Sequence, residues 1–152
     1  MTTFFIFAAK YLFVLPVLML GGYFFLQPRQ EQKNMMLFAI PAALLAYVLA
    51  LIAGHLYFDP RPFVVGHFTP LVPHAADNGF PSDHTLLASA LAAIGMYWNR
   101  RLGLSLWIIA AIIAVARVYV GVHHTIDVVG SMLIALAAVA AWHAVYRRSL
   151  QK

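Results

Sequence analysis

Long apolar runs constrain this chain more than any other feature of its sequence. Residues 35–57 form one such run, with no charged side chain in it. At about 1.5 Å of rise per helical residue, a run of this length crosses the hydrocarbon layer of a bilayer with some tilt to spare. Hydrophobic residues make up 63% of the sequence, above the roughly 45–50% that is usual for soluble domains. The sequence therefore predicts an all-α integral membrane protein.

Five apolar segments are predicted to cross the membrane. They cover residues 4–26, 35–57, 81–98, 102–120 and 125–146. Bends in the first segment are expected at Pro16 and at the glycine pair 21–22, and Gly121 is expected to end the fourth segment. Residues 27–34 should form a short polar loop, and the proline-rich residues 58–81 a long irregular one. The length suits one polytopic helical bundle over residues 1–152.

The basic residues predict how this bundle is oriented. Seven of the ten Lys and Arg residues fall into three groups, which are Arg29 and Lys33, Arg100 and Arg101, and Arg147, Arg148 and Lys152. Five alternating spans place all three groups on one side, which the positive-inside rule assigns to the cytoplasm. The N-terminus is then outside and the C-terminus cytoplasmic. The polar residues of the long loop and of the stretches 81–84 and 117–127 meet at the outer face.

Charge and cysteine content exclude several functions. The net charge is +5, but the basic residues sit at the ends of apolar runs and form no continuous stripe. This pattern argues against a nucleic-acid partner and for a protein whose surroundings are the lipid bilayer. With no cysteine in the chain, disulfides, a thiol nucleophile and cysteine-ligated metals are excluded as well.

One short stretch concentrates ionisable groups, A-R-V-Y-V-G-V-H-H-T-I-D at residues 116–127. Ionisable groups in a membrane usually face a partner or a polar cavity. His123 and Asp127 are four residues apart, so on a helix the carboxylate can hold one ring nitrogen of the imidazole in a fixed tautomer. Arg117 lies six residues upstream, and its guanidinium is suited to binding an anion. This arrangement favours attack on phosphorus or proton transfer.

Three sequence elements occur in a characteristic order. They are Arg61-Pro62, then Pro81-Ser82-Asp83-His84, then Arg117-x5-His123-x3-Asp127. Together they resemble the type-2 phosphatidic acid phosphatase superfamily, whose pattern is K-x6-R-P, P-S-G-H and S-R-x5-H-x3-D. The match covers roughly residues 54–130. The P-S-D-H form and the small size are most similar to bacterial undecaprenyl-diphosphate phosphatases of the bacitracin-resistance type.

The resemblance implies a role for each matched residue. His123 is the expected nucleophile, Asp127 orients it, and His84 is the expected general acid. The phosphoryl oxygens would be held by Arg61, Arg117, the Ser82 hydroxyl and the N-terminal amides of the third span. The phosphate-binding stretch there is Pro81-Ser82-Asp83. Two arginines supply the positive charge and the chain lacks the carboxylate cluster that magnesium usually takes, so no metal or other cofactor is expected.

Three positions depart from the family pattern. Gly54 stands where the family has a lysine, Asp83 where it has a glycine, and Ala116 where it has a serine. A carboxylate in the first turn of a helix is favoured by the helix dipole, so Asp83 can point away while the amides bind the anion. The missing lysine removes one phosphate contact, and His55, Lys10 or a main-chain group are its alternatives.

The implied reaction is hydrolysis of undecaprenyl diphosphate to undecaprenyl phosphate and phosphate at the outer face of the plasma membrane. This reaction recycles the carrier lipid of cell-wall synthesis. A phosphatase for phosphatidic acid or phosphatidylglycerophosphate is the alternative within the same chemistry. Two alternatives belong to other classes, namely a histidine-based haem or metal protein and a non-enzymatic lipid carrier. The sequence does not indicate an oligomeric state.

Simpler interpretations of the same residues stay open. Arg61 and Arg117 fit interfacial anchors, His84 fits a helix-end histidine, and Ser82 fits an N-cap. His124 competes with His123, because it lies three residues from Asp127 and only the family spacing prefers its neighbour. The remaining histidines match no element and are expected to be structural or interfacial; they are His55, His67, His74 and His143.

Overall fold

The computed structural model describes residues 1–149, and within this range the chain is folded into helices without a strand. The helices are α1 (Thr2–Tyr11), α2 (Val14–Phe25), α3 (Arg29–Leu56), α4 (Pro62–Val65), α5 (Asp83–Trp98), α6 (Arg100–Tyr119) and α7 (Thr125–Ser149). The predicted all-α membrane bundle is thereby confirmed. Lys152, one of the basic residues used to predict orientation, lies outside the described residues.

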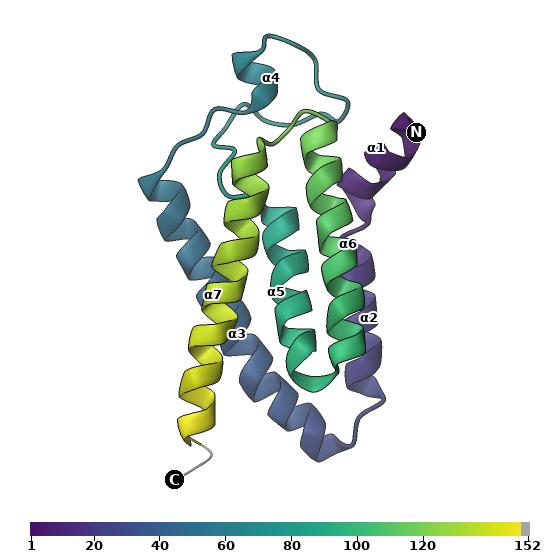
Figure 1. Ribbon diagram of the computed structural model, residues 1–152, viewed down its shortest axis with the longest axis vertical. Coiled ribbons are helices and arrows are strands. Elements are labelled where there is room, and N and C mark those ends of the chain that lie inside the picture. The colour runs from purple at the N-terminus through teal and green to yellow at the C-terminus, as the bar shows by residue number, and fades with distance from the viewer. Residues whose placement is uncertain (150–152) are drawn as a thin grey trace.

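The long helices lie side by side, and successive ones run in opposite directions (Figure 1). Helix α5 packs against both α6 and α7, α3 packs against α7, and α1 packs against α6. The segment between α3 and α5, with the short α4, covers one end of the bundle together with the α6–α7 connection (Figure 1). The α2–α3 and α5–α6 connections and the described C-terminal end lie at the opposite end.

Small residues set the close packing of α5 against α6. A Cβ atom on Gly95 would lie 3.0 Å from Leu106 Cδ1 and 3.5 Å from the Gly103 Cα atom. A Cβ atom on Gly103 would overlap the main chain of Met96. Close approach of helix backbones through small residues is the usual way in which helices associate in a membrane. This contact holds the C-terminal part of α5 against the N-terminal part of α6, at the end of the bundle away from α4.

The first predicted span is a broken helix. Helices α1 and α2 meet at an angle of 51°, and the break falls at Leu12 and Phe13, not at the expected bend positions. Pro16 explains the break, because it has no N–H for a bond to the carbonyl of Leu12, and its ring crowds that carbonyl. The glycine pair 21–22 lies within α2 without interrupting it.

Two predicted loops are shorter than expected. Helix α3 begins at Arg29, so the predicted polar loop 27–34 is wrong over most of its length. Its Glu, Gln and Lys residues are good helix formers. Helices α5 and α6 are joined by Asn99 alone, whose Oδ1 accepts hydrogen bonds from the amides of Arg101 and Leu102 at 3.0 Å each. Here a capping side chain replaces the predicted basic turn.

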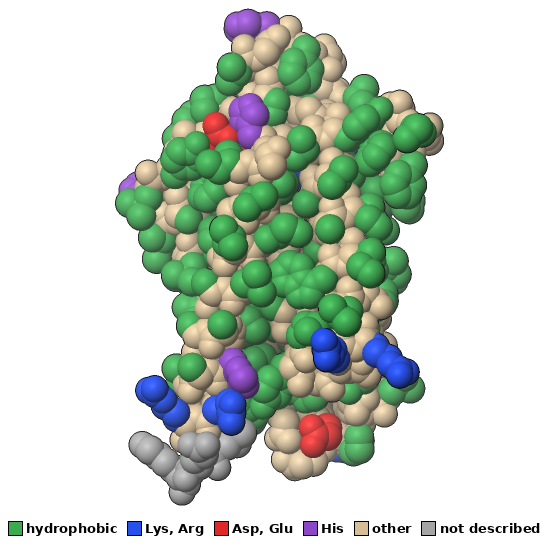
Figure 2. Space-filling view, in the orientation of Figure 1, with side chains coloured by type: hydrophobic (Ala, Val, Ile, Leu, Met, Phe, Trp, Pro, Cys, Tyr) green, Lys and Arg blue, Asp and Glu red, His purple; other side chains and the backbone are tan. Residues whose placement is uncertain are grey.

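The number of membrane crossings stays a prediction. Helices α3, α6 and α7 are each long and apolar enough to cross, and the bent α1–α2 pair makes a fourth candidate. Helix α5 has 16 residues and is shorter than the roughly 20 that a span requires. Figure 2 shows Lys and Arg side chains gathered at the end of the molecule away from α4, which is the distribution used to predict the orientation.

Candidate active site

The C-terminus of α6 turns the chain back towards its own last residues. The amide of Gly121 donates to the carbonyl of Val118 at 3.0 Å, and the amide of Val122 to that of Arg117 at 3.3 Å. These two bonds form a Schellman motif, which requires a left-handed residue directly after the helix. Gly121 meets this need with φ 81°, so its predicted role as helix terminator is confirmed. The motif brings His123 back to Arg117.

His123 is buried and held through both ring nitrogens. Nδ1 lies 3.2 Å from Oδ2 of Asp127. Nε2 lies 3.3 Å from Nη1 of Arg61 and 3.3 Å from Nη2 of Arg117. Since guanidinium groups only donate, Nε2 must carry the lone pair and Nδ1 the proton. The atom that a nucleophile needs is therefore free of hydrogen and lies between two positive charges.

Arg61 reaches this position through bonds that no sequence pattern indicated. Its Nε donates to Oδ1 of Asp77 at 2.7 Å, and Nη1 and Nη2 donate to the carbonyls of Val122 and Asn78 at 2.9 and 3.2 Å. The residue is 5% exposed although it comes from the long loop. A buried guanidinium tied to both the loop and the α6–α7 connection fixes the two segments relative to each other.

Arg117 is less completely paired. Its Nη1 donates to the carbonyl of Ala9 in α1 at 3.2 Å, while its buried Nε has no partner among the described residues. The broken first span thus contributes directly to the site through its main chain. An unpartnered buried N–H next to the nucleophile is donor capacity that an anion can use.

Asp127 lies in the first turn of α7 and is fully buried. Its Oδ2 accepts from the amide of His124 at 2.8 Å as well as facing His123. Its Oδ1 has no partner within residues 1–149. A carboxylate fixed by a main-chain amide orients the imidazole and favours its protonated form once charge develops.

Asn78 ties the long loop to the end of α3. Its Nδ2 donates to the carbonyls of Gly54 and Tyr57 at 2.8 and 3.1 Å, and its Oδ1 accepts from the amides of Asp59 and Phe80 at 2.9 and 3.0 Å. All four bonding positions of this side chain are therefore used. Sequence reasoning noted Asn78 only as a polar loop residue, because the loop's folding back onto α3 leaves no local signal.

A side chain at Gly54, where the family pattern has a lysine, would crowd the residues before α5. A Cβ atom there would lie 3.0 Å from the carbonyl oxygen of Phe80 and 3.3 Å from Cδ of Pro81. The α3 backbone approaches the start of α5 directly at this point. Besides Arg61, the loop brings His74 near the nucleophile, with its ring centroid 6.1 Å from that of His123.

The residues at the start of α5 differ in how deeply they are buried beside the site. Ser82 is the N-cap and is buried, but its side chain makes no capping bond and accepts instead from Thr85 at 3.2 Å. Ser131 of α7 donates to the carbonyl of Ser82 at 3.0 Å. Asp83 is exposed and Pro81 half-buried. The start of α5 is thus attached to α7 near Asp127.

His84 is half-buried and packs edge-on against Phe13, with 4.8 Å between ring centroids. It lies near Arg117 and His123. In the described part of the chain, no hydrogen bond joins His84 to another residue of the site. Its predicted role as proton donor stays a prediction.

His124 faces away from the two arginines. Its Nδ1 lies 2.8 Å from Oδ2 of Asp59, so it pairs with the carboxylate at the end of α3. Asp59, His124 and Asp127 offer ligand atoms within 4.8 Å of one another. Hydrogen bonds already occupy His124 Nδ1 and Oδ2 of Asp127. These bonds join the long loop to the start of α7, which explains why the three side chains lie together. Of the two neighbouring histidines, it is His123 that meets the arginines.

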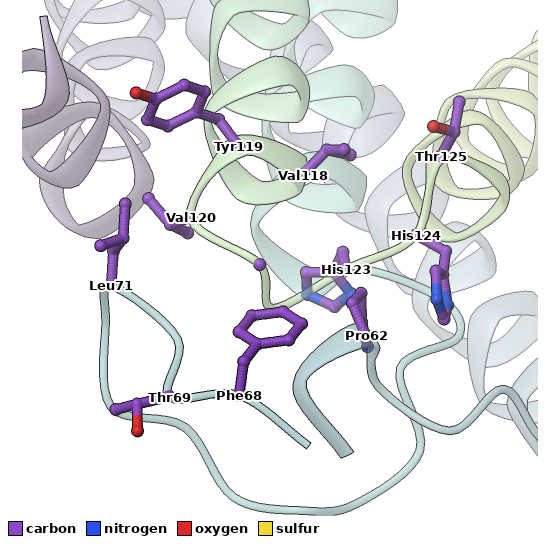
Figure 3. Close-up of a pocket in the computed structure, with 11 residues that line it drawn as sticks. Pro62, Phe68, Thr69, Leu71, Val118, Tyr119, Val120, His123, His124 and Thr125 are labelled. Atoms are coloured by element: carbon purple, nitrogen blue, oxygen red, sulfur yellow. The ribbon is translucent and has the colours of Figure 1, made fainter. Parts of the chain in front are cut away.

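A pocket of about 450 Å³ opens beside this cluster. Figure 3 shows His123 and His124 on one side of it, Phe68 and Thr69 from the loop opposite, and Val118 and Tyr119 at the end of α6. Burial lowers the pKa of His123, an effect that the hydrogen bond from its Nδ1 to Asp127 opposes. The pKa of His74 is lowered by burial and by the charge of Arg61. Both rings are therefore mainly neutral near pH 7.

The fold and this site together define a class of protein. Its members are helical membrane bundles in which a buried neutral imidazole lies between two guanidinium groups. The sequence profile of the PAP2 superfamily matches residues 35–151. The chain belongs to this superfamily, as its three sequence elements predicted.

Individual relatives agree with this assignment. Undecaprenyl-diphosphatase BcrC of Bacillus subtilis (strain 168) is 34% identical over 134 residues, which is 86% of this chain and 67% of the relative. The putative undecaprenyl-diphosphatase YbjG of Escherichia coli (strain K12) is 36% identical over 104 residues. That alignment covers 65% of this chain and 52% of YbjG. The chain thus spans about two thirds and about half of these relatives.

Solved structures share the fold. LpxE of Aquifex aeolicus superposes with a TM-score of 0.73 at 23% identity, over 94% of this chain and 83% of that one. A PAP2-type phosphatidylglycerolphosphate phosphatase from Bacillus subtilis gives a TM-score of 0.60 at 24% identity, over 97% of this chain and 75% of that one. The chain therefore shares its helical arrangement with these two proteins.

Proposed function

We propose that this protein hydrolyses undecaprenyl diphosphate to undecaprenyl phosphate and inorganic phosphate. The observation that carries the proposal is the position of His123 Nε2, which lies 3.3 Å from a nitrogen of each of two buried guanidinium groups. A phosphoryl group bound by those donors would meet Nε2 directly. The names of BcrC and YbjG support the diphosphate substrate.

In the first step, Nε2 of His123 attacks the terminal phosphorus. An N–P bond forms, and the bond from phosphorus to the bridging oxygen breaks. His84 gives its proton to that departing oxygen, and undecaprenyl phosphate leaves. Asp127 stabilises the positive charge that develops on the imidazole, as a carboxylate does for a catalytic histidine elsewhere.

In the second step, water attacks the phosphohistidine. His84, now neutral, takes a proton from the water, the N–P bond breaks, and inorganic phosphate is released. His123 returns to its starting tautomer because Asp127 keeps the proton on Nδ1. Each proton taken up is therefore returned within one turnover.

Arg61 and Arg117 stabilise the transferring phosphoryl group. In phosphoryl transfer, charge is spread over three equatorial oxygens, and preorganised donors supply most of the catalysis. The unpaired Nε of Arg117 offers one further N–H. The Ser82 hydroxyl and the main-chain amides in the first turn of α5 complete the proposed phosphate-binding site. The reaction needs no metal in this scheme.

We place the site on the outer face of the plasma membrane, with the N-terminus outside and the C-terminus in the cytoplasm. The alternating directions of α2, α3, α5, α6 and α7 and the basic residues at the end away from the site support this orientation. There the site would meet carrier lipid left after cell-wall polymerisation. Reporter fusions at residue 30, in the loop 63–80 and after residue 152 test it, and a cytoplasmic signal from the loop fusion would refute it.

The substrate is tested with purified protein in one detergent. We expect kcat/KM for undecaprenyl diphosphate to exceed that for phosphatidic acid and phosphatidylglycerophosphate, and activity to survive EDTA. A preference for either glycerolipid of about tenfold, or roughly 1.4 kcal/mol in the transition state, would contradict the assigned substrate. Loss of turnover in EDTA that magnesium restores would contradict the metal-free scheme.

A further inference from the structure

A second hollow of about 460 Å³ lies along the surface between α6 and α7. It is lined by Ala111, Ala114, Val115, Val118 and Tyr119 of α6 and by Thr125, Val128, Val129 and Met132 of α7. We call this hollow the α6–α7 groove. On each helix the lining residues recur at three- and four-residue steps, so they form one face of that helix.

The α6–α7 groove continues the pocket that contains His123. Val118, Tyr119 and Thr125 line both hollows. Figure 3 shows Val118 and Tyr119 at the end of α6 and Thr125 at the start of α7. From this shared edge the groove follows α6 and α7 away from the site end. Polar groups therefore lie at one end of a continuous surface and purely apolar side chains along the rest.

Small side chains make the groove hollow. Ala111 and Ala114 leave space on α6, and α5 packs between α6 and α7 behind this face (Figure 1). Val115 is 57% exposed and Val129 45% exposed, so the groove is open sideways along its length. In a bilayer such an opening faces hydrocarbon and admits a lipid chain without passage through water.

We propose that the α6–α7 groove binds the first isoprene units of the substrate's hydrocarbon chain while the diphosphate occupies the pocket at His123. This inference rests on the proposed function. Between the pocket and the groove, the shared edge has only two polar side chains, Tyr119 and Thr125. The groove therefore favours a substrate whose apolar chain is attached directly to the phosphate, without a polar linker. Its volume lies within the range of small-ligand pockets and is too small for a transmembrane helix.

Filling the groove tests the proposal. Val115→Trp and Val129→Trp place a large ring in it from opposite walls, at positions whose exposure leaves the packed interior unchanged. Leu51→Trp on α3 is the matched control, since Leu51 is 56% exposed and lines neither hollow. For each variant, kcat/KM is measured with undecaprenyl diphosphate and with isopentenyl diphosphate, which has only one isoprene unit.

We expect both groove variants to lose tenfold or more in kcat/KM for the long-chain diphosphate and less than twofold for the short one. Leu51→Trp should change neither. An equal loss of kcat/KM on both substrates, or no loss on either, would overturn the proposal. So would groove variants that change the cross-linked oligomer but keep the wild-type preference for chain length, because the groove would then bind a second protein chain. Failure of wild-type protein to hydrolyse either diphosphate would instead refute the proposed function.

Discussion

The two ends of the bundle use arginine in opposite ways. Arg100, Arg101, Arg147 and Arg148 are exposed at the end away from the site. At the site end, Arg61 and Arg117 are 5% and 3% exposed. A buried charge is costly unless it is paired, and these two guanidinium groups meet at one neutral imidazole. Arg61 is paired with the carboxylate of Asp77, whereas no carboxylate pairs with Arg117 among the described residues. The buried pair can therefore bind a further negative charge, while the exposed arginines are open to water and lipid head groups.

The largest effect is expected from removing the imidazole of His123, at which the two buried arginines meet. His123→Ala should lower turnover roughly 10³-fold or more, as loss of a covalent nucleophile does. His124→Ala, which breaks only the contact with Asp59, should retain most activity. Phosphate release from undecaprenyl diphosphate measures both. An inactive His124→Ala beside an active His123→Ala would show that the wrong histidine has been assigned.

A comparison of Arg117→Ala with Arg100→Ala tests whether a buried arginine matters more for activity than an exposed one. Removing one preorganised donor at a developing charge typically costs about 10²- to 10³-fold in rate, and we expect this for Arg117→Ala. Arg100→Ala removes an exposed charge and should leave kcat/KM unchanged. Thermal unfolding of both variants serves as the folding control. If the two variants lose activity equally, burial does not distinguish the two groups of arginines.

A pair of glycines tests how closely the loop must approach the site. A Cβ atom on Gly79 would lie 2.9 Å from Oδ2 of Asp127 and 3.0 Å from the carbonyl oxygen of Asp59, whereas one on Gly22 meets nothing within 4 Å. Gly79→Ala should therefore displace the loop and lower kcat, by about tenfold for a misplacement of this size. Gly22→Ala is the control and should have wild-type kcat. Wild-type activity in Gly79→Ala would show that the loop contact is dispensable.

The smallest effect concerns pH. Burial lowers the pKa of His123, so the reactive neutral ring persists below the ordinary value of about 6.5. The unfolded chain then binds more protons than the folded one as pH falls through that value, and both stability and kcat/KM decrease on the acid side. A pH profile of kcat/KM with its acid limb below pH 6.5 is expected. An acid limb above 6.5 would mean that Asp127 outweighs burial.

The sequence predicted the helical membrane bundle and the cluster of Arg117, His123 and Asp127 because both rest on local spacing. The apolar period of a helix and a glycine after a helix are properties of neighbouring residues. The expectation that His123 and Asp127 share one helix face is wrong, because α7 begins at Thr125. His123 instead reaches Asp127 from the α6–α7 connection. The contacts that complete the site depend on chain segments far apart. Arg61 is placed by Asp77 and Val122, and Arg117 by the carbonyl of Ala9.

Loop and helix boundaries were less predictable for a related reason. The break in the first span follows from Pro16 acting on the carbonyl four residues before it, which moves the bend away from the proline itself. Gly54 appeared only as a missing lysine, whereas in the folded chain it is a point of close contact with Phe80. Neither packing against a distant segment nor the reach of a side chain is visible in local composition.

Trapping the covalent intermediate is the measurement that tests the central claim most directly. Undecaprenyl diphosphate labelled on its terminal phosphate is mixed with enzyme, and the reaction is quenched in base within the first turnover. The account predicts labelled protein whose phosphate is stable in base, labile in acid, located at His123 by peptide mapping, and absent from His123→Ala. Label at His124, or full turnover with no labelled protein at any quench time, would contradict attack by Nε2 of His123.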